Sequence, residues 1–61
     1  MTEKEKALEI LNKTKSVEIA NYMIDELIYQ VEYIDTYLGN LAHMRGYLYK
    51  VKKHINEKDN L

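Results

Sequence analysis

With 61 residues, the chain is long enough for one small domain, and it has no cysteine for disulfides or thiolate metal sites. Hydrophobic residues make up 46% and charged residues 31%, a balance typical of a folded, helix-rich protein and not of a disordered one. A single core of this size rarely stabilises a fold by more than a few kcal/mol without further support. We therefore expect residues 1–61 to form a single helical domain that gains stability from a second copy or another partner.

The composition predicts an all-α fold, because proline is absent and the only two glycines are Gly39 and Gly46. A first, short helix is expected over residues 3–12. Its start is marked by Thr2 and Glu5, which have the spacing of a capping box. Its apolar stripe consists of Ala7, Leu8 and Leu11, with Ile10 beside it. Polar residues 12–15 then indicate a turn.

A second, long helix is expected over residues 16–38, with Ser16 as its N-cap. Apolar residues follow in alternating steps of three and four, which is the a/d pattern of a coiled coil. They are Val17, Ala20, Ile24, Leu27, Val31, Ile34, Leu38 and Leu41. This line of residues predicts a continuous seam that packs in the core or against another subunit.

A third helical segment is expected over residues 40–57, and residues 58–61 are expected to form a frayed tail. The third helical segment extends the seam with Met44, Leu48, Val51 and Ile55. The step from Leu41 to Met44 repeats a three where a four is due, and two structures fit this slip. Either the helix breaks at Gly39 and Asn40, with Asn40 as the next N-cap, or one long, kinked coiled-coil helix runs through. The break is favoured because the segments before and after it carry opposite charge, as described next.

Charge is distributed unevenly along the chain, although its net value is −1. Residues 16–44 carry no Lys or Arg and five carboxylates, which are Glu18, Asp25, Glu26, Glu32 and Asp35. Residues 45–58 carry five basic side chains against one glutamate. An acidic helix folded back on a basic one would be held by attraction.

Four tyrosines lie nearly opposite the seam of the long helix when it is drawn at about 100° per residue. They are Tyr22, Tyr29, Tyr33 and Tyr37, with Glu26 among them. One interpretation is that these rings close the core of a three-helix dimer. The other is that they form a recognition face, because tyrosine offers a large contact area at low entropic cost. In the second interpretation the partner-binding residues are Tyr22, Asp25, Glu26, Tyr29, Glu32, Tyr33 and Tyr37.

The basic segment suggests an alternative nucleic-acid-binding face. Its residues are Arg45, Lys50, Lys52 and Lys53. Tyr47 and Tyr49 could stack on bases. Dedicated nucleic-acid-binding domains are usually basic overall, whereas this chain has a pI near 6.1. Nucleic acid is therefore the second choice of partner.

Catalytic residues, cofactors and metal sites are not expected. His43 and His54 are eleven residues apart, about 16 Å along one helix, and so cannot share a metal within one chain. His54 and Glu57 have the spacing of an i,i+3 ligand pair, which only an oligomer could complete. The only serine, Ser16, is better used as a cap than as a nucleophile. No apolar run suits a membrane span or a signal core, so we expect a cytoplasmic protein.

Together these features predict a small non-enzymatic regulator or inhibitor of the kind common in phages and bacteria. We expect a helical homodimer that docks on a target protein through an acidic, tyrosine-bearing helix face and has no small-molecule substrate. A dimeric nucleic-acid-binding protein and a structural coiled-coil subunit of a larger assembly are the alternatives.

Overall fold

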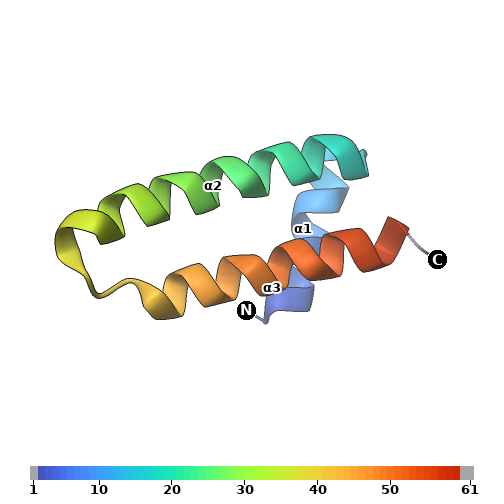
Figure 1. The fold of residues 1–61 in the computed structure, drawn as a ribbon. Helices are drawn as coiled ribbons and strands as arrows, with labels where there is room; N and C mark the ends of the chain where they lie inside the picture. The colour runs from blue at the N-terminus through green and yellow to red at the C-terminus, as the bar shows by residue number, and fades with distance from the viewer. Residues whose placement is uncertain (1, 60–61) are drawn as a thin grey trace.

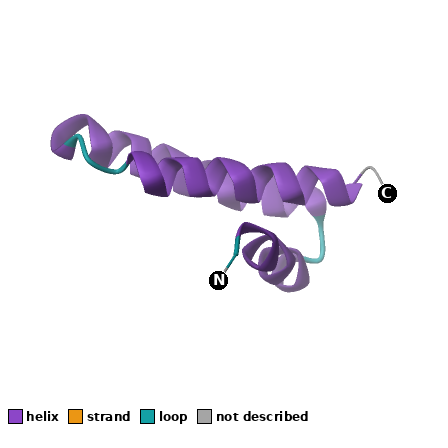
Figure 2. Cartoon of the chain, turned by 90° about the horizontal axis from the view of Figure 1, so that it is seen from below, coloured by secondary structure: helices purple, strands orange, loops and turns teal. Residues whose placement is uncertain are grey.

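The protein is a three-helix structure in a computed structural model that describes residues 2–59, with side chains as far as residue 57. The helices are α1 (Glu3–Thr14), α2 (Val17–Leu38) and α3 (Ala42–Asp59). α2 and α3 lie side by side as an antiparallel hairpin, and α1 crosses one face of it near its open end (Figure 1, Figure 2). Residues 2–59 contain no strand, and the predicted all-α fold is confirmed. Of the predicted tail, residues 60–61 lie outside the described part, while α3 continues to Asp59.

The start of α1 is fixed by the predicted capping box. The Thr2 hydroxyl accepts a hydrogen bond from Glu5 N at 3.1 Å, and Thr2 N donates to the Glu5 carboxylate at 2.9 Å. These bonds, the one from the Thr2 backbone foremost, hold the pKa of Glu5 below its usual value. α1 runs two residues beyond the predicted end and stops at Lys15, whose backbone is left-handed (φ 56°).

The turn between α2 and α3 distinguishes the two structures that the sequence allowed. Gly39 adopts a left-handed conformation (φ 70°) and its N–H bonds to Asp35 O at 2.8 Å, which ends α2. The chain then reverses, so the hairpin is present and the long kinked helix is not. The prediction of Asn40 as the next N-cap is wrong by one residue, because Leu41 O accepts the first bond of α3, from Arg45 N.

Short polar side chains accept backbone hydrogen bonds at the start of α2 and just ahead of α3. Ser16 Oγ accepts from Ile19 N at 3.2 Å, as predicted for the N-cap. Asp35, in the last turn of α2, reaches forward and accepts from Leu41 N at 2.8 Å. This bond satisfies a backbone donor ahead of α3 that no helical carbonyl can reach. The Asp35 side chain therefore connects the end of α2 to the residue that precedes α3.

The core is one cluster in which all three helices meet. Its buried members are Ala7, Ile10, Ala20, Ile24, Ile28, Leu48, Val51 and Ile55, with Leu11, Val17, Val31 and Tyr47 packed against them. In α1 the buried side is centred on Ala7 and Ile10, whereas Leu8, which the stripe had placed inward, is 40% exposed. The whole cluster lies where α1 crosses the hairpin.

The predicted seam of α2 divides after Ile24. One branch continues through Ile28, a residue outside the a/d pattern, which is buried against α3. The other branch, Leu27, Ile34 and Leu38, is 38%, 45% and 63% exposed. In α3, Met44 is also exposed, whereas Leu48, Val51 and Ile55 are buried. The seam is therefore an intramolecular core only at the open end of the hairpin.

Replacing Ile24 with aspartate should unfold the protein. Its side chain has no exposed surface, so an unpaired carboxylate there costs about 4 kcal/mol or more, comparable to the whole stability of a domain this small. Circular dichroism should show loss of helix at 25 °C. Ile19→Asp, on the exposed side of the same helix, is the matched control and should melt like the wild type. A folded Ile24→Asp protein would show that the core is misplaced.

Replacing each of the two glycines with alanine should change the stability of the protein in opposite directions. Gly39 has φ +70°, which costs a residue with a Cβ about 1 kcal/mol or more, so Gly39→Ala should destabilise. Gly46 lies inside α3, and a Cβ there meets no atom within 4 Å. Gly46→Ala should therefore stabilise by about 0.5–1 kcal/mol. Urea denaturation of both variants measures the two changes, and equal signs would contradict this account of the turn.

Candidate protein-binding surfaces

The first candidate surface is the outer side of α2, here called the tyrosine face and made of Tyr22, Tyr29, Tyr33 and Tyr37 with Glu26. The four rings are between 58% and 73% exposed. None of them belongs to the core cluster in which α1 packs against the hairpin. The rings therefore do not close the core within one chain. Since no described residue covers them, a second subunit or a target would have to do so.

Two rings of the tyrosine face are held against each other. The Tyr33 and Tyr37 rings meet edge to face, with centroids 5.4 Å apart and planes at 63°. The Tyr37 hydroxyl donates to the Tyr33 hydroxyl at 3.5 Å, and this bond raises the pKa of Tyr37. Because the pair is already ordered, fixing these side chains in a complex costs less entropy than fixing two free rings.

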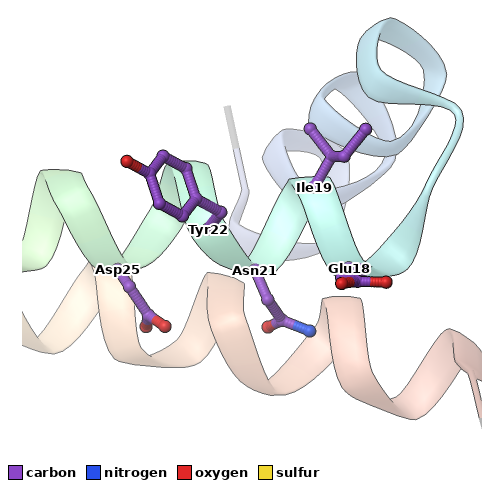
Figure 3. Close-up of a pocket in the computed structure, with 5 residues that line it drawn as sticks. All are labelled: Glu18, Ile19, Asn21, Tyr22 and Asp25. Carbon is purple, nitrogen blue, oxygen red and sulfur yellow. The ribbon is translucent and has the colours of Figure 1, made fainter.

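The tyrosine face has two hollows. One is lined by Tyr29, Gln30, Tyr33 and Ile34, in the middle of α2. The other, at the start of α2, is lined by Glu18, Ile19, Asn21, Tyr22 and Asp25. Figure 3 shows Tyr22 and Ile19 directed away from α3, while Asn21 and Asp25 point towards it. Each hollow combines aromatic and aliphatic walls, so each can accept an apolar side chain of a partner.

Most carboxylates of α2 are engaged with α3. Asp25 pairs with Lys52 Nζ at 2.7 Å, and Asp35 pairs with Arg45 at 3.5 Å. The Glu32 carboxylate accepts a hydrogen bond from Tyr49 at 3.2 Å. Beside these contacts, Asn21 and Asn56 exchange two amide hydrogen bonds at 2.9 and 3.0 Å. The acidic helix and the basic helix thus satisfy each other along their shared edge.

Because of this pairing, the predicted partner-binding residues do not all lie on one surface. Asp25 and Glu32 belong to the edge that faces α3, whereas Glu26 stands among the tyrosines and forms no ion pair with any described side chain. Gln30, which the sequence did not single out, joins the central hollow. The structure therefore brings together an aromatic surface with Glu26, which has no ion pair among the described side chains, at its centre.

The basic residues of α3 are divided in the same way. Arg45 and Lys52 are paired with carboxylates of α2. Lys50 and Lys53 are exposed and form no ion pair within residues 2–57. Nucleic-acid affinity depends on the number of phosphates that basic side chains neutralise. Two free lysines on a surface otherwise neutralised by α2 make a small footprint for such binding.

The second candidate surface, here called the closed-end face, consists of Leu27, Ile34, Leu38 and Met44. Leu38 lies eighteen residues after Ala20, which is five turns, so both point in the same direction. Met44 lies eleven residues before Ile55, about three turns, and points nearly as Ile55 does. Ala20 and Ile55 are buried where α1 crosses, whereas Leu38 and Met44 are 63% and 52% exposed because α1 does not extend to them.

The histidines of α3 do not form a metal-binding cluster with other described residues. His54 Nδ1 lies 3.2 Å from the Glu57 carboxylate, but no group of three or more potential ligands gathers within residues 2–57. None of the helices described is long and apolar enough to cross a bilayer. Comparisons with protein-family models, curated proteins and solved structures found no match for this chain.

The tyrosine pair can be detected by titration. Replacing Tyr33 with phenylalanine removes the acceptor that stabilises the protonated Tyr37 phenol, so the pKa of Tyr37 should fall back towards 10.0. Because the folded pKa is raised, any contribution of this bond to folding is present at neutral pH and lost as the pH rises through that pKa. Ultraviolet titration, with Tyr29→Phe as the control, measures the shift. An unchanged pKa in Tyr33→Phe would mean that the two hydroxyls are not bonded.

Proposed function

We propose that this protein is a small non-enzymatic regulator or inhibitor that acts as a helical homodimer and binds a target protein through its tyrosine face. The observation that carries the proposal is that four tyrosines of one helix are more than half exposed on the side away from the core. Burying a large aromatic side chain is worth about 1.5–3 kcal/mol, so a chain with a small core forgoes much stabilisation by leaving four in water. A target that covers the rings recovers it.

The chemistry of the face suggests the chemistry of the target. The hollow between Tyr29, Tyr33 and Ile34 suits an apolar side chain, and the phenol groups can exchange hydrogen bonds around its edge. Glu26, which has no partner among the described side chains, would attract an arginine or lysine. The proposed target therefore presents an apolar projection next to a basic residue. The helix holds its contact residues rigidly, as a stoichiometric inhibitor requires.

The edge of α2 that faces α3 contributes little to this proposal. Asp25 and Glu32, although acidic, are occupied by Lys52 and Tyr49. Their role in the proposed complex is to keep α2 straight against α3, which positions the rings. Among the carboxylates of the predicted set, Glu26 is the one that supports direct contact.

The double variant Tyr29→Ala, Tyr33→Ala should keep the fold and lose the target. Both rings are exposed, and alanine favours the helix more than tyrosine does, so circular dichroism should be unchanged. One truncated hot spot costs about 2 kcal/mol, or about 30-fold in the dissociation constant, so losing both should raise that constant by about 30-fold to 1,000-fold. Capture from a native lysate with mass spectrometry identifies the target, and calorimetry with the purified target measures the change.

The matched control is Lys50→Ala, Lys53→Ala, which alters two exposed residues on the other helix. It should bind the target as the wild type does. Labelled duplex DNA, titrated at two salt concentrations, tests the nucleic-acid alternative with the same proteins. Tight, salt-sensitive DNA binding that only the lysine variant loses would overturn the proposal, as would a tyrosine variant that keeps full affinity for the target.

A further inference from the structure

The a/d pattern of α2 is longer than the fold needs. Intramolecular packing follows Ala20, Ile24 and Ile28, in steps of four. From Leu27 onwards the heptad positions leave this line, and Leu27, Ile34 and Leu38 are exposed beside half-buried Val31. A strict repeat of this kind is a pattern for packing against another helix. Neither α1 nor α3 buries Leu27, Ile34 or Leu38.

We infer that the closed-end face binds the same face of a second copy, with the two α2 helices antiparallel about a twofold axis. The inference builds on the homodimer of the proposed function and locates its interface. The members of this face on α2 are Leu27, Ile34 and Leu38, and half-buried Val31 lies between them. These four residues are spaced by four, three and four residues, a pattern that reads the same in both directions. Antiparallel pairing therefore sets Leu27 against the partner's Leu38, and Val31 against the partner's Ile34.

Charge on the flanks of the stripe permits this self-pairing. α2 carries five carboxylates, so a second copy would be repelled if they bordered the contact. The flanking positions on the side away from α3 are Met23, Gln30 and Tyr37, none of which is charged. On the other side lies Asp35, which Arg45 neutralises. The acidic helix thus offers an uncharged border along the one stripe that can meet its own copy.

The area left uncovered agrees with a small dimer interface. The chain exposes 4648 Å², whereas a compact monomer of 7.3 kDa is expected to expose about 4,200 Å². Covering the excess on two copies would bury about 900 Å², which is in the size range of weak, reversible interfaces. The stripe from Leu27 to Leu38 is about 16 Å long, and α1 limits it at the open end.

The mass of the protein in solution tests this inference. The wild type should have twice the mass of the 7.3 kDa chain by light scattering, with dissociation on dilution. Ile34→Asp would bring a carboxylate into the contact on both copies, which should raise the dimer dissociation constant by roughly 100-fold. Ile19→Asp is the matched control, because it makes the same change on the same helix at a similarly exposed position and should remain dimeric. Leu38→Asp gives a second reading in case Ile34→Asp loses helix.

Cysteine pairing tests the antiparallel geometry, since the chain has no cysteine of its own. A mixture of Leu27→Cys and Leu38→Cys chains should form the mixed disulfide faster than either variant forms a disulfide with itself. Faster self-pairing of each variant would refute the antiparallel arrangement. A wild type that stays monomeric at all concentrations, or an Ile34→Asp variant that stays dimeric, would overturn the inference.

Failure of the dimer and failure of the target interface are distinguishable. A monomeric wild type that still binds its target through Tyr29 and Tyr33 would remove the dimer and leave the tyrosine face as proposed. A dimeric wild type whose tyrosine variant binds the target normally would remove the tyrosine face as the target site and leave the dimer as inferred. Light scattering that shows species larger than a dimer would favour a structural coiled-coil subunit and overturn the closed twofold pairing.

Discussion

The direction of α1 determines which parts of this protein are covered. A helix that ran along the hairpin could cover the apolar side of α2 over its whole length of about 33 Å. α1 crosses the hairpin instead, so it covers little more than one helix diameter, about 10 Å. The buried cluster is confined to that crossing, and Leu38 and Met44 remain in water although they continue the lines of Ala20 and Ile55. The closed end of the hairpin is apolar and uncovered for this reason alone.

Electrostatics hold the hairpin together at the end that α1 does not reach. Asp35 accepts from Leu41 N and pairs with Arg45, so one partly buried carboxylate joins the end of α2, the turn and the first turn of α3. Farther along, Asp25 with Lys52 and Glu32 with Tyr49 join the same two helices. Exposed ion pairs contribute little to stability individually, and here they mainly fix which edge of α2 faces α3. They keep three of the five carboxylates of α2 on the shared edge, so that, apart from Glu18 and Glu26, the acidic side chains of α2 lie away from its aromatic and apolar sides.

Local signals in the sequence were sufficient for most of the secondary structure. The capping box at Thr2, the cap at Ser16 and the left-handed Gly39 each act through a hydrogen bond or a backbone conformation specific to that residue. The charge contrast between residues 16–44 and 45–58 correctly favoured the hairpin over one long helix. Asn40 was misassigned because two adjacent residues can serve as the start of α3, and Asp35, five residues away, settles the choice.

Tertiary placement was less accessible from the sequence. Periodicity defines an apolar arc on α2, and this arc is wide enough to hold both Leu27 and Ile28. Which of the two is buried depends on the angle at which α3 approaches, and no local pattern encodes that angle. The same limit applied to Leu8, which lies on the stripe of α1 but outside the contact. The tyrosines could be placed opposite the seam by spacing alone, but only the structure shows that the described helices leave them between 58% and 73% exposed.

The two proposed surfaces adjoin on one helix, and they share Ile34, which belongs to the closed-end face and also lines the central hollow of the tyrosine face. The closed-end face lies on the side that α1 crosses, and the tyrosine face lies on the outer side, bordered by Gln30 and Tyr37. A twofold dimer formed through the closed-end face would bury Ile34 but leave the four tyrosines of each copy exposed, with the two tyrosine faces antiparallel to each other. Such a dimer can engage two sites of a symmetric target at once, which strengthens binding without any new contact. The apolar stripe that the short α1 leaves open would then serve binding by doubling the number of tyrosine faces.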